Sequence, residues 1–392
     1  MASCDFDQVR SRKGTHSIKW EFTHAFFGSD ELLPLWVADM DFPSPPEVVE
    51  ALSQRAQHGI FGYTGISDDY LKALVEWMKT RHNWDIQPEW NVFTNGVVPA
   101  LNMVLQTFAK PGDGVVIQPP VYYPFFNAIR NNGQHLLTNT LLEKDGHYTM
   151  DVADLEEKLR HPNTTVMILC SPHNPVGRVW TKEEIMLVAH LCLQHDVLLV
   201  SDEIHHDLVY PPHRHQVTAS LSEAIAGNTI TCTAPSKTFN LAGLQCSNIL
   251  VSDAKKRRRF ERTLERNGFF GINPFGEAAT IAAYRHGASW LDHLLDYLLS
   301  NQRDMAAYLR KHLPQVRIND AEGTYLAWLD FRELHLSRKE LEHLIQEKAG
   351  LALNHGHVFG VTGEGFQRLN FACPKSILME AMDRLANAVR AL

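Results

Sequence analysis

The feature that most constrains the fold is a repeated alternation of short apolar runs and helical segments in the middle of the chain. The apolar runs, rich in valine, isoleucine and leucine, stand at 115–117, 166–169, 197–200, 229–231 and 249–251. Residues 97–108, before the first run, and residues 182–195, between the second and third runs, have the apolar spacing of helices. Short β-branched runs separated by helices are typical of buried, mostly parallel strands with helices on both faces of the sheet. The sequence therefore predicts an α/β fold.

The last third of the chain has a different pattern, which predicts a smaller α+β domain. Residues 277–311 have helical spacing, and 325–329 and 366–371 are strand-like. Ser337 and Glu340 form a capping box before a helix that is expected to end at Gly350. We predict a large domain over residues 47–285. The small domain combines residues 1–46 with 286–392, and a long helix near 285–310 connects the two domains.

Composition and charge exclude several classes of protein. The 392 residues include 44% hydrophobic and 21% charged residues, which is ordinary for a globular protein and excludes a mainly disordered or fibrous chain. The formal net charge is −8, so the chain lacks the basic footprint of a nucleic-acid binder. We interpret the basic run at 255–259 as the solvated face of a helix.

Cysteine use and the N-terminal sequence favour the cytoplasm. There are six cysteines, Cys4 among them, and none has Cys-x-x-Cys spacing, so buried reduced thiols are expected. The first 20 residues lack the apolar core of a signal peptide. No stretch of about 18 apolar residues is present, so we expect no membrane span.

Three residues with useful chemistry follow predicted strands: Asn174, Asp202 and Lys237. In sheets of this kind, ligands bind at the carboxyl ends of the strands. Burial lowers the pKa of a lysine in such a place and makes its amine a nucleophile and a base. Taken alone, each residue also has a plainer interpretation: a turn for Asn174, a salt bridge for Asp202 and an exposed side chain for Lys237.

Two further features complete a cofactor site. Gly96 opens a helix with Val97 and Val98, and the free N–H groups at such a helix end can cradle a phosphate. Tyr122 follows a strand, where its ring could stack on a planar ligand or simply pack in the core. Together the features suit pyridoxal 5′-phosphate (PLP). The amine of Lys237 can form a Schiff base with the PLP aldehyde, and the carboxylate of Asp202 can pair with the pyridine nitrogen. Asn174 and His205 can donate hydrogen bonds to the phenolic oxygen.

The sequence resembles the fold-type I PLP-dependent enzymes of the aspartate aminotransferase superfamily. Within that superfamily it is most similar to the MalY/PatB-type cystathionine and cysteine-S-conjugate β-lyases. The resemblance covers nearly the whole chain and rests on seven stretches: Leu35–Phe42, His58–Tyr63, Ser171–Gly177, Ser201–His206, Ala234–Gln245, Tyr325–Asp330 and Gly365–Asn370. It implies a PLP-dependent transferase-like fold.

The resemblance implies a role for each cofactor residue. Lys237 would hold the cofactor and act as the proton-transfer base, while Tyr122 would stack on the ring. Ser236 would join residues 96–98 at the phosphate. Tyr63 would reach the phosphate of the neighbouring subunit, which implies a homodimer with shared active sites.

It also implies the substrate contacts. Arg368 would bind the α-carboxylate of an amino acid through a two-pronged contact. Tyr123 would act as a catalytic residue beside the leaving group, and Asn174 and Ala38 would complete the contacts. The implied activity is β-elimination of L-cystathionine or related S-substituted L-cysteines to a thiol, pyruvate and ammonia.

The sequence departs from the aminotransferase pattern at two places, and two alternative functions stay open. Gln245 stands where many aminotransferases carry an arginine, as expected for the lyase branch. In the loop at 353–360, His355 and His357 either touch the substrate or are solvated. The alternatives are a class I/II aminotransferase of the same fold and a PLP-binding protein with an added regulatory role.

No metal site is expected from the sequence. The chain has no His-Glu-x-x-His motif. His205 and His206 would point in opposite directions on an extended strand.

Overall fold

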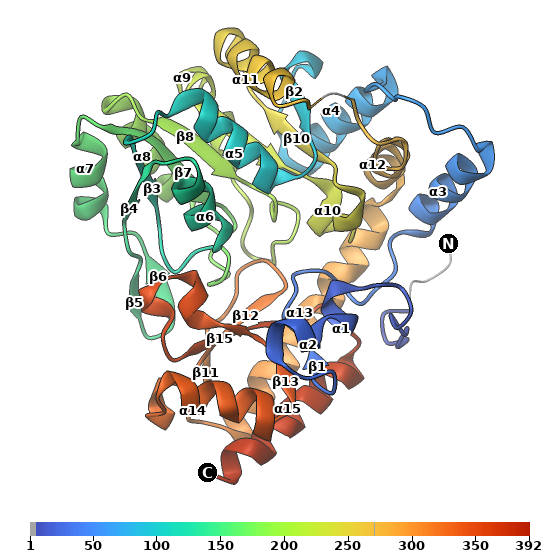
Figure 1. Cartoon of the computed structure of the whole chain (residues 1–392), viewed down its shortest axis with the longest axis vertical. Helices are drawn as coiled ribbons and strands as arrows, with labels where there is room; N and C mark the ends of the chain where they lie inside the picture. The colour runs from blue at the N-terminus through green and yellow to red at the C-terminus, as the bar shows by residue number, and fades with distance from the viewer. Residues whose placement is uncertain (1–4, 270) are drawn as a thin grey trace.

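The computed structural model describes residues 5–269 and 271–392, so Cys4 lies outside the described residues. Its centre is a seven-stranded sheet in the order β2-β10-β9-β8-β7-β3-β4 (Figure 1). The strands are β2 (Asn91–Thr94), β3 (Gly114–Ile117), β4 (His135–Thr138), β7 (Thr164–Cys170), β8 (Leu198–Asp202), β9 (Thr229–Thr233) and β10 (Ser247–Leu250). The neighbours from β4 through β9 pair in parallel, and β10 is antiparallel to both β9 and β2. The predicted α/β fold with a mostly parallel sheet is confirmed.

Helices cover both faces of this sheet because neighbouring residues of each strand point to opposite sides. On one face, Val115 and Ile117 of β3 belong to a buried cluster with α5 (Val97–Phe108), α6 (Pro124–Asn131) and α11 (Ala254–Arg266). On the other face, Val116 packs in a cluster with α7 (Val152–Arg160), α8 (Lys182–Gln194) and α9 (Glu223–Gly227). This burial on both sides explains why the strand segments are continuous apolar runs.

The C-terminal part contains a four-stranded antiparallel sheet in the order β11-β12-β15-β14. The strands are β11 (Arg317–Ile318), β12 (Leu326–Asp330), β14 (Asn354–His355) and β15 (Phe366–Asn370). The helices α14 (Arg338–His343) and α15 (Lys375–Arg390) accompany it. The predicted capping box of Ser337 and Glu340 begins α14. A π-helical turn over Leu344–Lys348 then carries the chain to Gly350.

The N-terminal segment pairs with this C-terminal part. Strand β1 (Leu33–Pro34) runs parallel to β13 (Leu351–Ala352). The short helices α1 (Ile18–Glu21) and α2 (Thr23–Phe27) lie beside it (Figure 1). The contact agrees with the expected packing, and the domain boundaries themselves stay a prediction. The remaining elements are α3 (Pro46–His58), α4 (Asp68–His82), the hairpin β5 (Leu142–Lys144) and β6 (His147–Thr149), and α10 (Pro235–Thr238).

The single helix predicted over 277–311 is wrong, because the chain forms two helices there. They are α12 (Pro274–His286) and α13 (Ala288–His312), with Gly287 between them. A Cβ atom at Gly287 would lie 2.4 Å from Cε1 of Phe239 and 2.5 Å from the carbonyl oxygen of Ala283. The ring of Phe239, two residues after Lys237, therefore packs closely against this glycine. Helical spacing alone does not reveal such a contact.

Two other expectations concern the whole chain. The five cysteines among the described residues are buried and free of disulfides. Of the described helices, none is both long and apolar enough to span a lipid bilayer.

Candidate active site

A cavity of about 190 Å³ lies at the carboxyl ends of β7, β8 and β9. The strand register explains this, because Asp202 at the end of β8 pairs with Cys170 of β7 and Cys232 of β9. The cavity brings together most of the predicted site residues: Ala38, Gly96, Val97, Val98, Tyr122, Asn174, Asp202, His205, Ser236 and Lys237. Gln245 also lines it.

Lys237 lies on the short helix α10, directly after β9. Its Nζ donates a hydrogen bond of 2.6 Å to the carbonyl oxygen of Ala38. Burial, together with the nearby Arg368, lowers the pKa of Lys237 to about 8, although the carboxylates of Asp39 and Asp202 oppose the shift. About a tenth of the amine is therefore neutral at pH 7 and able to accept a proton.

Asp202 is 3% exposed. One carboxylate oxygen accepts a 3.2 Å hydrogen bond from the backbone N–H of Ile204. Burial, together with the neighbouring Glu203, raises the pKa of Asp202 to about 7, although the backbone hydrogen bond and Lys237 oppose the shift. A carboxylate in this environment favours a cationic partner inside the cavity.

The N-terminus of α5 also lines the cavity. Gly96 precedes the helix with φ of 116°, a conformation that favours glycine. Its N–H donates to Ser247 Oγ at 3.1 Å. The N–H groups that the helix start offers to an anion are thus those of Val97 and Val98.

Arg368 on β15 is 3% exposed and lies next to Asn174, which lines the cavity, although Arg368 itself does not line it. Its guanidinium donates to Asn174 Oδ1 and to the carbonyl oxygen of Trp36, each at 3.0 Å. It also donates to Asn354 Oδ1, and the ring of Phe359 lies 4.9 Å from its central carbon. Burial lowers the pKa of Arg368 to about 10. The side chain is therefore a fixed cation beside the Asn174 amide.

The aromatic candidates occupy two environments. Tyr122 lines the cavity, and burial raises the pKa of its hydroxyl. The ring of Tyr123 lies 5.4 Å from that of Tyr122 and 6.2 Å from that of Phe359, and the residue is 39% exposed. His205 is buried, and burial lowers the pKa of its imidazole well below the usual value.

Three predicted features lie elsewhere or differ from the expectation. Tyr63 is fully exposed and is not among the residues that line the cavity of its own chain. His355 and His357 do not line it either, and His355 pairs with Gln346 at 3.0 Å. His205 and the residue after it lie in a turn, because β8 ends at Asp202, so the expected extended strand is wrong there.

Sequence reasoning did not find the residues that hold the 37–42 segment against the cavity. Tyr325 donates its hydroxyl hydrogen to the Ala38 carbonyl oxygen at 3.0 Å. Asn240 and Asn370 donate to the carbonyl oxygens of Met40 and Val37, at 2.9 and 2.6 Å. All three lie in the stretches that carry the family resemblance, which was the available signal.

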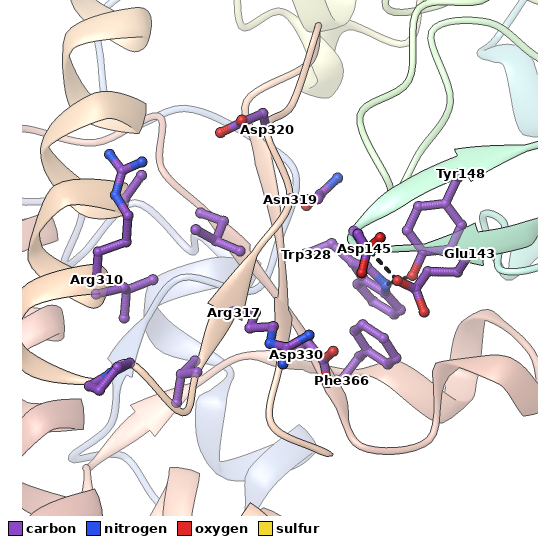
Figure 2. Close-up of a pocket in the computed structure, with 16 residues that line it drawn as sticks. Glu143, Asp145, Tyr148, Arg310, Arg317, Asn319, Asp320, Trp328, Asp330 and Phe366 are labelled. Atoms are coloured by element: carbon purple, nitrogen blue, oxygen red, sulfur yellow. Dashed lines mark hydrogen bonds between the residues drawn. The ribbon is translucent and has the colours of Figure 1, made fainter. Parts of the chain in front are cut away.

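A second cavity, of about 330 Å³, lies between the β5–β6 hairpin and the C-terminal sheet (Figure 2). Trp328 and Tyr148 meet in its wall, where the indole N–H donates to the hydroxyl at 3.1 Å. No residue of the predicted site lines this second cavity.

The fold and the first cavity define the class of protein. The chain belongs to the aminotransferase class I and II family, which it matches over residues 30–385. Among its relatives, the cystathionine β-lyase PatB of Bacillus subtilis is 46% identical, and the alignment covers 98% of this chain and 100% of that protein. The protein MalY of Escherichia coli is 35% identical over 99% of both chains.

A solved structure agrees with these relatives. Cystalysin from Treponema denticola, whose structure contains a pyridoxal 5′-phosphate cofactor, superposes with a TM-score of 0.97 at 41% identity over 99% of both chains. These findings confirm the predicted family resemblance and the fold class.

Proposed function

We propose that this chain is a PLP-dependent carbon–sulfur β-lyase. Its substrate is L-cystathionine or a related S-substituted L-cysteine, and its products are a thiol, pyruvate and ammonia. The observation that carries the proposal is one buried cavity lined by Lys237, Asp202 and the start of α5, with Arg368 bonded to Asn174 at its edge. The lyase names of the relatives PatB and cystalysin support it.

The residues of the cavity fit PLP. The buried carboxylate of Asp202 suits a protonated pyridine nitrogen, and the Val97 and Val98 N–H groups suit a phosphate. Nδ1 of His205 and Nε of Arg368 are buried polar atoms without a hydrogen-bond partner among the described residues. Bound PLP supplies an electron sink that stabilises negative charge at the substrate Cα.

The protein's own residues then have separate tasks. Arg368 holds the α-carboxylate and so fixes the orientation of the Cα–H and Cβ–S bonds. The neutral amine of Lys237 takes the Cα proton. The C–S bond breaks, and the sulfur leaves as a thiolate that takes a proton from Tyr123 or Lys237. Hydrolysis of the remaining three-carbon fragment gives pyruvate and ammonia.

A single assay tests the reaction. Purified, PLP-loaded protein is given L-cystathionine without any keto acid, and pyruvate and free thiol are measured together. Equal amounts of both over many turnovers support the lyase. Conversion that appears only when a keto acid is added overturns it in favour of an aminotransferase.

The homodimer with a shared active site is also part of the proposal. Tyr63 lies in a segment where Ile60 and Phe61 are 68% and 55% exposed, as expected of a surface that a second copy covers. We expect light scattering to give twice 44.5 kDa. We also place the enzyme in the cytoplasm, which the buried free cysteines support.

Tyr63→Phe should weaken PLP binding roughly tenfold, because it removes one hydrogen bond to a charged phosphate. The measurement is a titration of the cofactor-free protein with PLP. Tyr308→Phe, on α13 away from the cavity, is the control. Unchanged PLP affinity in Tyr63→Phe would contradict the shared site.

Arg368→Lys should raise the KM for L-cystathionine roughly 10–100-fold, since an ammonium cannot replace the two-pronged guanidinium contact with a carboxylate. Steady-state kinetics measure this, with Arg310→Lys on the exposed end of α13 as the control. A KM equal to that of the wild type would show that the carboxylate binds elsewhere.

A further inference from the structure

A cluster of metal-ligating side chains lies behind the turn that carries Lys237, outside the cavity described above. His82 is the last residue of α4, and His206 and Asp207 follow β8. One ligand atom from each of the three lies within 4.8 Å of the others. No other such group of three was found among residues 5–269 and 271–392.

The carboxylate of Asp207 is buried without a permanent positive charge among its hydrogen-bond donors. Its side chain is 1% exposed. It accepts hydrogen bonds from His82 Nε2 at 2.8 Å, Trp77 Nε1 at 3.1 Å and Thr238 Oγ1 at 2.7 Å. A buried carboxylate needs a compensating charge, and neutral donors supply only part of it.

His206 points an unpaired nitrogen at the same carboxylate. Its Nδ1 lies 2.6 Å from the carbonyl oxygen of Glu203, which accepts only, so the ring donates from Nδ1. In the neutral ring, Nε2 therefore carries a lone pair. That atom lies 3.4 Å from Oδ2 of Asp207 and is buried without a hydrogen-bond partner among the described residues. Two lone pairs that face each other at this distance call for a cation between them.

A proton on His206 is the competing source of that charge. The neighbouring His215 does not compensate Asp207, because its Nε2 lies 2.7 Å from a different carboxylate, that of Glu203. A metal ion satisfies both the imidazole nitrogen and the carboxylate without protonating a buried ring.

We propose that a divalent cation of the zinc type binds to Nε2 of His82, Nε2 of His206 and the carboxylate of Asp207. Two imidazoles and one carboxylate form a ligand set that suits zinc and its borderline neighbours. Zinc ligands lie about 2.1 Å from the ion, so ligand atoms that now lie up to 4.8 Å apart must approach to roughly 3.5 Å by small side-chain rotations. On binding, the neutral ring of His82 changes tautomer: its proton moves through solvent from Nε2 to Nδ1, Nε2 binds the ion, and water occupies the remaining position.

Neighbouring groups hold the proposed ligands in place by hydrogen bonds, as second-layer residues do in metal proteins. The Glu203 carbonyl fixes the ring of His206, and Trp77 and Thr238 fix the carboxylate of Asp207. Thr238 follows Lys237 directly on α10. The ion therefore fastens the turn that carries the reactive amine, and the inference does not depend on which substrate the enzyme uses.

The test uses the PLP-loaded enzyme, produced without a histidine tag. Elemental analysis should give about one zinc per chain. After chelator treatment, titration with cobalt(II) alone should give visible absorption bands that saturate at one ion per chain. His206→Gln should weaken cobalt binding roughly 100-fold or more. His213→Gln replaces an exposed histidine that lines the same surface pocket as His82, His206 and Asp207, and this variant should bind cobalt as the wild type does.

Three results would overturn the site. The first is wild-type enzyme with well under one metal ion per chain that also gives no cobalt bands. The second is a His206→Gln variant that binds cobalt as tightly as the wild type. The third is loss of binding in His213→Gln alone. If His206→Gln does not fold, the wild-type metal content and cobalt spectrum decide the question.

Discussion

Replacement of Lys237 by alanine is expected to lower the rate of C–S cleavage by roughly 10⁴-fold or more, since a positioned base alone contributes up to about 10⁴. The amine lies in the cavity, within 2.6 Å of the Ala38 carbonyl oxygen, and its lowered pKa of about 8 makes it partly neutral near neutral pH. Alanine removes both the base and the group that we propose to hold the cofactor. Pyruvate formation from L-cystathionine measures the loss.

Two variants separate the chemistry of Lys237 from its charge. Lys237→Arg keeps a cation but has no amine that can lose its proton near neutral pH, so it should be as inactive as the alanine variant. Lys311→Ala, near the exposed C-terminal end of α13, should be fully active. Substantial pyruvate formation by either Lys237 variant, over many turnovers, would remove Lys237 from the reaction.

Much of the fold could be predicted because its signals are local. The apolar runs at 115–117 and 166–169 become β3 and β7, with their ends extended by one or two residues. Ser337 and Glu340 cap α14 as expected, since a capping box involves residues three positions apart. The candidate site could be predicted from the sequence for a related reason: parallel strands place the residues that follow them at a common edge of the sheet.

The remainder depends on contacts between distant parts of the chain. Gly287 divides a helical pattern because Phe239, 48 positions earlier in the sequence, packs against it. Lys237 donates to a carbonyl oxygen of residue 38, and no periodic pattern identifies a backbone acceptor. The sequence does not identify Asn354 as a site residue, although it bonds Arg368, because its neighbours have the pattern of a loop.

The cluster of His82, His206 and Asp207 also could not be predicted from local sequence patterns. On an extended strand, His206 would point away from His205. The strand ends at Asp202 instead, and the following turn directs His206 toward His82 and Asp207. His82 is 124 positions away from His206, so no local motif joins them. A motif search for metal ligands detects sites on one element, and this cluster draws on two.

Asp202→Asn is expected to lower activity strongly while stabilising the cofactor-free protein. The amide keeps an oxygen that can accept the Ile204 N–H hydrogen bond but cannot hold a charge opposite a protonated pyridine nitrogen. The electron sink then weakens. We expect a loss of pyruvate formation on the order of 10³-fold, equivalent to about 4 kcal/mol of transition-state stabilisation.

The stability effect follows from the pKa of Asp202, which burial raises to about 7 in the folded chain against about 3.9 in an unfolded one. The folded state therefore binds this proton more tightly. The stability that the protonated group contributes is lost as the pH rises from about 4 to about 7. Asparagine does not titrate, so the stability of cofactor-free Asp202→Asn relative to wild type should increase over this interval and stay constant above it. Three pKa units correspond to about 4 kcal/mol, an upper bound on the gain.

Urea unfolding of the cofactor-free proteins at pH 5 and pH 8 measures this, with Asp320→Asn as an exposed control. Equal stability of wild type and Asp202→Asn at pH 8 would show that the carboxylate is compensated without a cofactor. The opposite signs of the two effects matter, because a residue retained for packing alone would lose activity and stability together. A carboxylate that destabilises the empty protein and is needed for turnover is one whose charge is held in place for the cofactor.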